Sequence, residues 1–204
     1  MSAAPSGPRA DAQRRRILDA ARKCFAERGF HAASMASIAE TAEMSPGLIY
    51  RYFAGKAEII QGIVRQQLAL MSEDLQARRG EPFDLVSLLL DSHEHRCGNV
   101  GQQTEQAGLD PGLLLEIAAE ASRDPAIRET MREVDNAVQS RIEDWLGRPV
   151  AQGGLGIAPE EVPPRALMLR FVIDGLKMRQ AYDPDLDRAV LERTLRRTMA
   201  ALVD

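Results

Sequence analysis

Aromatic residues, cysteine and long apolar runs are all scarce in this sequence. Aromatic side chains make up 4% of the 204 residues, and strand-favouring residues never gather into alternating runs, which argues against a β-sheet fold. The two cysteines lie far apart with no secretory leader ahead of them, which argues against a disulfide scaffold and for a reducing, cytoplasmic compartment. No apolar stretch reaches the roughly 18 residues that a membrane-spanning helix needs, so we expect no membrane partner.

Motifs of the common enzyme classes are also missing. The chain has three histidines, no glycine-rich phosphate-binding loop and no nucleophile elbow. His93 and Cys97 share one face of a predicted helix and have the side chains of soft-metal ligands, but the sequence shows no third ligand beside them. We therefore expect no enzyme activity, no catalytic residue, no bound metal and no cofactor.

Hydrophobic residues are plentiful enough, at 45%, for the chain to bury one or two cores. They recur at helical spacing, so the sequence predicts an all-α protein. The predicted helices begin near residues 11, 34, 45, 56, 83, 110, 124, 163 and 185. Residues 1–10 are small, polar and interrupted by proline and glycine, which predicts a disordered tail.

Charge is spread unevenly along the chain. The formal net charge is −4, but residues 1–60 carry +3 and the remaining residues carry −7. A small basic head on a larger acidic body indicates that the head binds a polyanion and that the body has a different partner.

Residues 34–53 have the pattern of a helix, a short turn and a second helix. Ser34 and Ser45 are good N-caps, and Pro46 suits the first position of the second helix. In a helix-turn-helix unit the second helix enters the DNA major groove by its N-terminal residues, and polar side chains around it donate to phosphates. The candidates for base contacts are Ser45, Pro46, Gly47 and Leu48, and those for phosphate contacts are Tyr50, Arg51 and Tyr52.

Positive side chains lie near the predicted starts of two helices. Arg14, Arg15 and Arg16 fall in the first turns of the first helix, and Lys56 opens the fourth. Cations at the positive end of a helix dipole cost about 0.3–1 kcal/mol each, so we expect phosphates outside the chain to supply their counter-charge. The alternative is a solvated charge run without such a role.

Residues 34–58 resemble the DNA-binding core of the tetracycline-repressor (TetR) family of bacterial regulators, and the likeness extends through residues 17–21 and 25–30. The resemblance implies an N-terminal three-helix helix-turn-helix domain, a helical ligand-binding body and a homodimer formed by the last two helices. We accordingly divide the chain into the tail 1–10, a DNA-binding domain 11–56 and a ligand-binding and dimerisation domain 57–204. The predicted DNA-binding residues are Arg14, Arg15, Arg16, Ser34, Ser45, Pro46, Gly47, Leu48, Tyr50, Arg51, Tyr52 and Lys56.

Three residues depart from the usual pattern of that family. Glu43 stands where the turn most often has glycine, and a left-handed backbone there would cost a non-glycine residue about 1–2 kcal/mol. Leu48 replaces a common threonine and Ala36 a common arginine, which removes two polar groups from the region that reads DNA. Apolar contact of Leu48 with a thymine methyl group is one substitute.

The helix predicted over 163–181 is apolar on nearly every side. Such a helix must be covered on two sides, and the last helix, 185–203, covers only one. A second copy of the chain would supply the other surface in a four-helix packing, and the alternative is a central helix within one subunit. We favour the homodimer because a helix-turn-helix dimer matches a two-fold symmetric DNA site.

The body carries a weaker signal for a ligand. Residues 116–125 and 172–179 resemble helices of a common subset of the family, in which a largely apolar pocket lies between the fifth and ninth helices. The ligand-binding candidates by position are His93, Cys97, Trp145, Phe171 and Met178. Each of these also suits an ordinary core position.

These features predict a ligand-responsive transcriptional repressor. A dimer would hold two recognition helices about 34–36 Å apart on a palindromic double-stranded operator, and a small-molecule effector would change that spacing. The alternative is a helical interaction protein that recruits another protein, with DNA binding incidental. A steep fall in DNA affinity with rising salt distinguishes the two, because phosphate contacts predict it.

Overall fold

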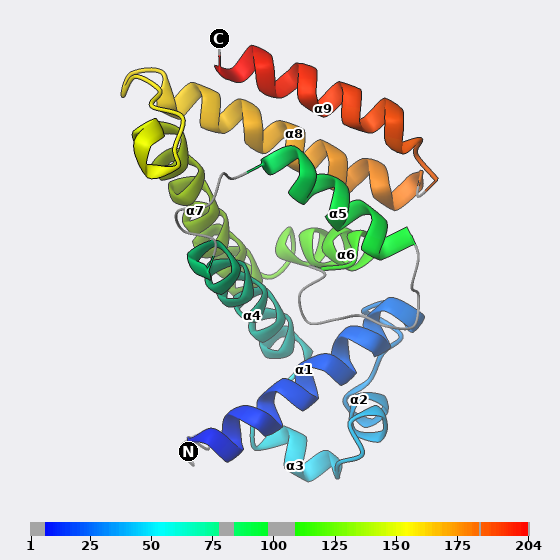
Figure 1. Cartoon of the computed structure of the whole chain (residues 1–204). Helices are drawn as coiled ribbons and strands as arrows, with labels where there is room; N and C mark the ends of the chain where they lie inside the picture. Colours follow the sequence, from blue (N-terminus) through cyan, green and yellow to red (C-terminus); the bar gives the residue numbers. More distant parts are fainter. Residues whose placement is uncertain (1–6, 78–83, 98–108, 184, 204) are drawn as a thin grey trace. The chain divides into compact units, whose positions relative to one another are not determined.

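The computed structural model describes residues 7–77, 84–97, 109–183 and 185–203, without the side chains of 71–77, 92–97 and 203. These residues form nine α-helices and one short 3-10 helix and contain no strand, which confirms the predicted all-α fold (Figure 1). The α-helices are α1 (Pro8–Arg28), α2 (Met35–Thr41), α3 (Pro46–Tyr50), α4 (Lys56–Ala77), α5 (Leu85–Cys97), α6 (Pro111–Ala121), α7 (Pro125–Gly147), α8 (Val162–Tyr182) and α9 (Arg188–Val203), and the 3-10 helix is η1 (Val150–Gln152).

α1 begins at Pro8, three residues before the predicted start. Proline suits a first helical position because its φ is already helical, and Ala10 is already buried. Residues 8–10 are therefore helical rather than part of a tail, and residues 1–6 lie outside the described ranges. The early start places residues 14–16 in the second and third turns, whereas the helix dipole acts within the first. The dipole argument for these three arginines is therefore wrong.

Serine N-caps begin α2 and α3, as predicted. The Ser34 hydroxyl accepts a hydrogen bond from the backbone N–H of Ser37 at 3.0 Å, and the Ser37 hydroxyl accepts one from the backbone N–H of Ser34 at 2.9 Å. The Ser45 hydroxyl accepts from the backbone N–H of Leu48 at 3.3 Å. Because α3 has five residues and few internal hydrogen bonds, its cap contributes a large share of its local stability.

The chain divides into two compact units. The first contains residues up to Gln67 together with Gly112–Glu133, and the second contains Leu68–Pro111 and Val134–Asp204. The predicted division after residue 56 does not follow this boundary, because the first half of α4, most of α6 and the start of α7 pack with the N-terminal helices. Both α4 and α7 run from one unit into the other.

The first unit has a core of aliphatic and phenylalanine side chains from α1 to α4. The fully buried ones include Ile17, Phe25, Ile38, Ile49, Phe53, Ile59, Ile60 and Ile63. α4 lies very close to this core at Gly62, where an added Cβ would be 2.9 Å from Leu18 Cδ2 and 3.1 Å from Phe53 Cε1. The absence of a side chain at this position is therefore a packing requirement.

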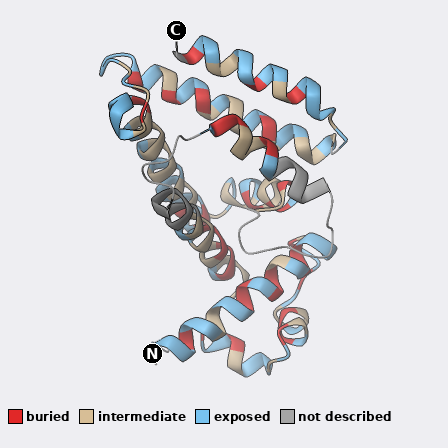
Figure 2. Cartoon of the chain, viewed as in Figure 1, coloured by how far each residue is buried: buried red, intermediate tan, exposed pale blue. Residues whose placement is uncertain are grey.

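In the second unit α5, α8 and α9 lie together (Figure 1). Their shared cluster consists of Val86, Leu90, Leu176, Leu191 and Leu195. Buried and exposed positions alternate along α8 and α9 (Figure 2). No helix in the described ranges is long and apolar enough to cross a membrane.

Candidate DNA-binding surface

α3 turns one residue inward and leaves its N-terminal end open to solvent. Ile49 is completely buried, whereas Ser45, Pro46 and Gly47 are exposed and Leu48 is half-buried. This narrow inward face agrees with the predicted recognition helix. The small exposed residues at its start allow another molecule to approach the backbone closely.

Gly47 has no conformational or packing reason to be glycine. Its φ is not in the left-handed region, and an added Cβ would meet no atom within 4 Å. Glycine inside a helix is less stable than alanine by about 0.5–1 kcal/mol. Its small size therefore benefits contact with another molecule more than the fold of this chain.

The two tyrosines that follow differ in exposure. Tyr50 is 56% exposed and Arg51 is exposed, so both are available to phosphates. Tyr52 is 9% exposed, because α3 ends at Tyr50 and the next turn directs Tyr52 and Phe53 inward. Tyr52 is therefore less accessible than Tyr50, and its contact with a phosphate stays a prediction.

Arg14 holds the segment that leaves α3. Its Nη1 donates to the carbonyl oxygen of Tyr52 at 3.3 Å, and its guanidinium lies over the ring of Phe53, 4.6 Å from the centroid. The guanidinium of Arg14 thus has binding partners within the chain itself. The side chain of Arg15, by contrast, is exposed and has no polar partner in the described part of the chain, as is also true of Arg51.

Lys56 connects the start of α4 to the loop after α1. Its Nζ donates to the carbonyl oxygens of Phe30 at 2.6 Å, Ala33 at 2.8 Å and His31 at 3.3 Å, and it lies 4.5 Å from the centroid of the Phe30 ring. These carbonyl oxygens stabilise the positive charge of Lys56, a role that was expected of DNA phosphates. Folding thus explains a lysine at this position, and the contact of Lys56 with a phosphate stays a prediction.

The turn between α2 and α3 confirms the suspected left-handed residue. Glu43 has a φ of +51° and is the one non-glycine residue with positive φ in the described ranges. Arg16 Nη2 lies 2.7 Å from Glu43 Oε2. The third arginine of the predicted DNA-binding set is thus paired with a carboxylate at the turn.

Two carboxylates on α6 contact the loop after α1, a feature that sequence reasoning missed. Glu116 Oε2 accepts a hydrogen bond from the backbone N–H of Phe30 at 2.6 Å. Glu120 Oε1 lies 3.0 Å from His31 Nε2 and 2.9 Å from Arg123 Nη1. The signal available in the sequence was a pair of glutamates four residues apart on an otherwise apolar helix.

The ligand-binding candidates with described side chains are Trp145, Phe171 and Met178. Phe171 is 66% exposed and Met178 is 42% exposed on α8, and neither lines the cavity described below, so their role in ligand binding stays a prediction. The side chains of His93 and Cys97 lie outside the described residues.

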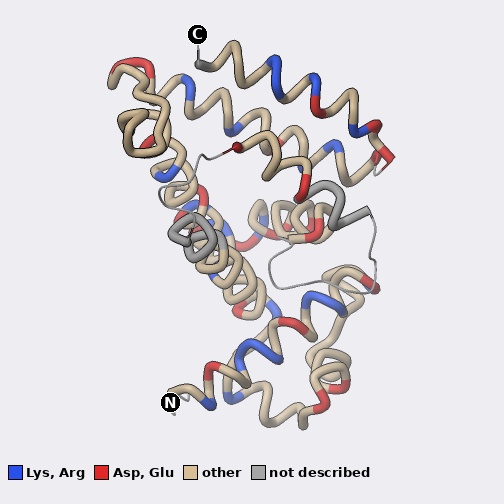
Figure 3. The backbone as a smooth tube through the Cα atoms, in the orientation of Figure 1, with Lys and Arg blue, Asp and Glu red and all other residues tan. Residues whose placement is uncertain are grey.

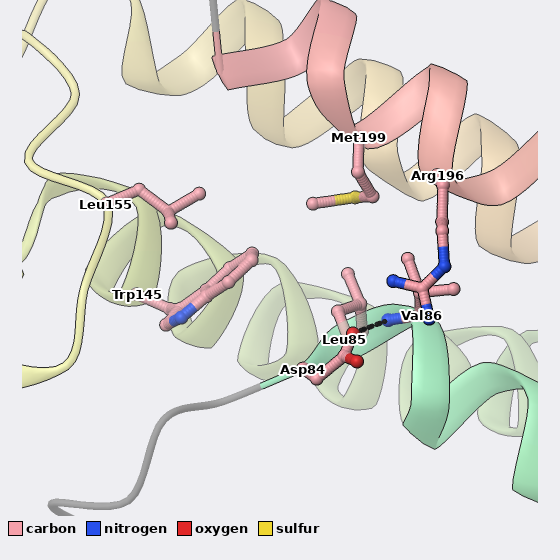
Figure 4. A pocket seen from close by; sticks show the side chains of 7 residues that line it. All are labelled: Asp84, Leu85, Val86, Trp145, Leu155, Arg196 and Met199. Carbon is pink, nitrogen blue, oxygen red and sulfur yellow. Dashed lines mark hydrogen bonds between the residues drawn. The ribbon is translucent and has the colours of Figure 1, made fainter.

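Trp145 lines an open cavity of about 260 Å³ in the second unit. Its other apolar lining residues are Leu85, Val86, Leu155 and Met199, and Asp84 and Arg196 add opposite charges (Figure 4). The Ser87 hydroxyl, which donates to the carboxylate at 2.7 Å, is the main reason that the pKa of Asp84 is lowered from its ordinary value of 3.8. The cavity thus contains an ionised acid that already caps α5.

These observations define the class of this protein as a helix-turn-helix DNA-binding protein with a separate helical body. Residues 17–63 match the family model described as bacterial regulatory proteins, tetR family. Residues 105–204 match the model described as BetI-type transcriptional repressor, C-terminal. The chain belongs to the tetR family of bacterial regulatory proteins.

Individual relatives agree with this assignment. The chain is 31% identical over 189 residues to the HTH-type transcriptional repressor AcnR of Corynebacterium diphtheriae, covering 90% of this chain and 87% of that protein. It is 34% identical over 119 residues to the HTH-type transcriptional regulator UidR of Escherichia coli K12. This match spans only 58% of this chain and 57% of that relative's length. Among solved structures, Salmonella enterica GusR is similar with a TM-score of 0.66 and 27% identity over 94% of this chain and 95% of that chain.

Proposed function

We propose that this protein is a ligand-responsive transcriptional repressor that binds a palindromic operator as a homodimer. The observation that carries the DNA-binding part is the exposed start of α3, where Gly47 leaves open space that folding does not require. Relatives described as transcriptional repressors support the regulatory role. Such a protein acts where the bacterial DNA is, in the cytoplasm.

The proposed surface makes two kinds of contact with DNA, to base edges and to phosphates. Ser45, Pro46, Gly47 and Leu48 approach the base edges in the major groove, with Leu48 against a thymine methyl group. Phosphate contacts come first from Tyr50 and from Arg15 and Arg51, which are exposed and without a polar partner in the described ranges, and these contacts set the register without reading sequence. Ser34 caps α2 beside this surface, and Arg14 and Lys56 support the surface from inside the fold.

The proposed homodimer uses the exposed apolar stripe of α8. The stripe follows a spacing of three and four residues through Met168, Phe171, Gly175, Met178 and Tyr182. An added Cβ at Gly175 would meet nothing within 4 Å, so the chain itself gives no packing reason for this glycine. Close packing of a second α8 against the stripe accounts for both features.

The effector is proposed to bind in the body, which is connected to the head through the continuous helix α4. Two proteins of similar fold were solved with ligands: Bacillus subtilis FadR with stearoyl-CoA and a regulator from Saccharomonospora viridis with choline. Both are about 20% identical to this chain, so their ligands do not identify its effector. An effector that favours the state with the wrong helix spacing by a few kcal/mol is enough to release DNA.

Selection of bound duplexes from a random pool tests this function. We expect a two-fold symmetric product with half-sites about one helical turn apart, and a steep loss of affinity as salt rises. Arg51→Ala should weaken binding to the selected duplex, whereas Lys23→Ala, which removes an exposed cation elsewhere on α1, should have a smaller effect. An asymmetric product, or binding that is insensitive to salt, would favour the interaction-protein alternative.

A further inference from the structure

Glu43 is an unusual residue for its position. Its backbone has a φ of +51°, a conformation that disfavours any side chain, and its own side chain is 84% exposed. Packing therefore gives no reason for a glutamate here. Its negative charge also lies two residues before Ser45, the N-cap of the recognition helix, where a DNA phosphate backbone would repel it.

The carboxylate has one polar partner among the described residues, Arg16 of α1, at 2.7 Å. Arg16 is 46% exposed, so the pair lies largely in solvent. Exposed ion pairs contribute little to folding, and this one does not explain why the strained residue is a glutamate. The pair does, however, neutralise a cation that belongs to the predicted DNA-binding set.

We propose that Glu43 limits the affinity of the head for DNA by neutralising Arg16. When the head approaches a duplex, Arg16 must exchange the Glu43 carboxylate for a phosphate, and the released carboxylate then remains beside the DNA. One counterion fewer is released on binding, so the affinity is lower and less dependent on salt than the arginine content of α1 indicates. This proposal rests on the proposed DNA-binding surface.

The arrangement of charge around the turn supports this interpretation. Lys and Arg residues outnumber Asp and Glu residues along α1, and the acidic residues around the end of α2 are Glu40 and Glu43 (Figure 3). Arg14 is held by the Tyr52 carbonyl and Arg16 by Glu43, whereas Arg15 has no polar partner among the described residues. Glu40, also exposed, has no ion pair in the described part of the chain.

Glu43→Gln is the direct test, because it removes the charge and keeps the length of the side chain and the strained backbone. Glu40→Gln is the matched control, since it removes the same charge from the neighbouring helix without releasing an arginine. Arg16→Ala and the double variant Arg16→Ala/Glu43→Gln complete a cycle. Each protein is titrated, as the full chain, with the selected duplex and with an unrelated duplex of equal length, from about 50 to 200 mM salt.

The expected result is that Glu43→Gln tightens binding to both duplexes roughly three- to tenfold at the lower salt and steepens the salt slope by about one counterion. Glu40→Gln should change affinity less than twofold, and the effect of Glu43→Gln should shrink to a similar size in the Arg16→Ala background, where only the direct repulsion between the carboxylate and DNA is removed. Equal effects of the two glutamine variants, or an effect of Glu43→Gln that keeps its full size without Arg16, would overturn the proposal. Weaker binding of Glu43→Gln to the selected duplex alone would instead assign the carboxylate to a cytosine N4 amino group.

A different result separates this proposal from the proposed function. If the wild-type chain binds neither duplex, the DNA-binding surface itself fails, and the pairing of Arg16 with Glu43 loses its proposed role with it. If the wild type binds the selected duplex with a steep salt dependence but the Glu43→Gln cycle is flat, only the affinity-limiting role fails.

Discussion

The carboxylate of Glu116 accepts a hydrogen bond from the backbone N–H of Phe30 at 2.6 Å, and the carbonyl of the same residue accepts one from Lys56 at the start of α4. One residue of the loop after α1 thus connects α6 to the first turn of α4. Loss of either side chain leaves a part-buried backbone group without its partner, so both contacts should be visible in stability measurements.

Glu116→Gln should destabilise the protein by about 1–2 kcal/mol, because a neutral amide is a weaker acceptor than a carboxylate for this N–H group. Chemical denaturation measures the change, and amide hydrogen exchange at Phe30 locates it. Glu27→Gln on the exposed side of α1 is the control and should be close to neutral. Unchanged protection of the Phe30 amide in Glu116→Gln would contradict the contact.

Lys56→Met should lower the free energy of unfolding by about 2–3 kcal/mol, since three carbonyl groups lose a charged donor. DNA affinity should fall only as far as the folded fraction does, and the salt slope should stay that of the wild type. A variant with normal stability and a slope reduced by about one would show that Lys56 contacts phosphate after all.

Gly47→Ala separates folding from DNA recognition. Folding should be unchanged or stabilised by about 0.4–1 kcal/mol, because the new methyl group meets nothing and restricts the unfolded chain. Affinity for the selected duplex should nevertheless fall at least tenfold if the backbone of α3 approaches the bases. Thermal unfolding and a binding titration on the same sample decide this, and a stabilised variant with full affinity would refute the close approach.

Phe171→Asp should convert the proposed homodimer into a monomer, because it places a charge on the α8 stripe at its most exposed phenylalanine. The matched control is Val150→Asp, which changes another exposed apolar residue, 73% exposed and outside α8. Sedimentation gives the oligomeric state, and affinity for a palindromic duplex should fall together with dimerisation. Dissociation by Val150→Asp but not by Phe171→Asp would exclude the α8 stripe as the interface.

Asp84→Ala tests the cap of α5 and its pH dependence. The carboxylate accepts from the backbone N–H groups of Val86 at 3.0 Å and Ser87 at 3.2 Å, so its loss should cost about 1 kcal/mol at pH 7. Because the pKa of Asp84 is lowered in the folded state, this contribution is fully present above about pH 4 and is lost as the pH falls through the folded value. Unfolding curves of the variant and the wild type should therefore converge in acid. A difference that stays constant down to pH 2 would rule out the carboxylate as its source.

Local sequence signals predicted those features of the fold that depend on interactions between residues close in sequence. Ser34 and Ser45 cap the helices that they were expected to cap, and the left-handed turn at Glu43 followed from a missing glycine. The contacts that Arg14 and Lys56 make within the chain were not predicted, because their partners Tyr52 and Phe30 lie 38 and 26 residues away in sequence. Helical spacing indicates which side of a helix is apolar, but it does not show which carbonyl a long cation reaches.

The body was harder to predict for a related reason. Apolar residues on every side of α8 indicated that two surfaces pack against it. The sequence did not show which residues of α8 face the interior of the chain and which face a second copy. Phe171 and Met178 were therefore assigned to a pocket although they lie on the exposed stripe. The contact of Glu116 with Phe30, 86 residues apart, leaves no periodic pattern at all.

The missing side chain at Gly62 has a consequence for how the head responds to any movement of α4. Leu18 and Phe53 lie so close to Gly62 that even one added methyl group would overlap with them. The packing between α4 and these two side chains therefore leaves no free space. α4 cannot move over these two side chains without displacing them. A rotation of its first turns therefore moves α1 and the segment that follows α3 together with α4.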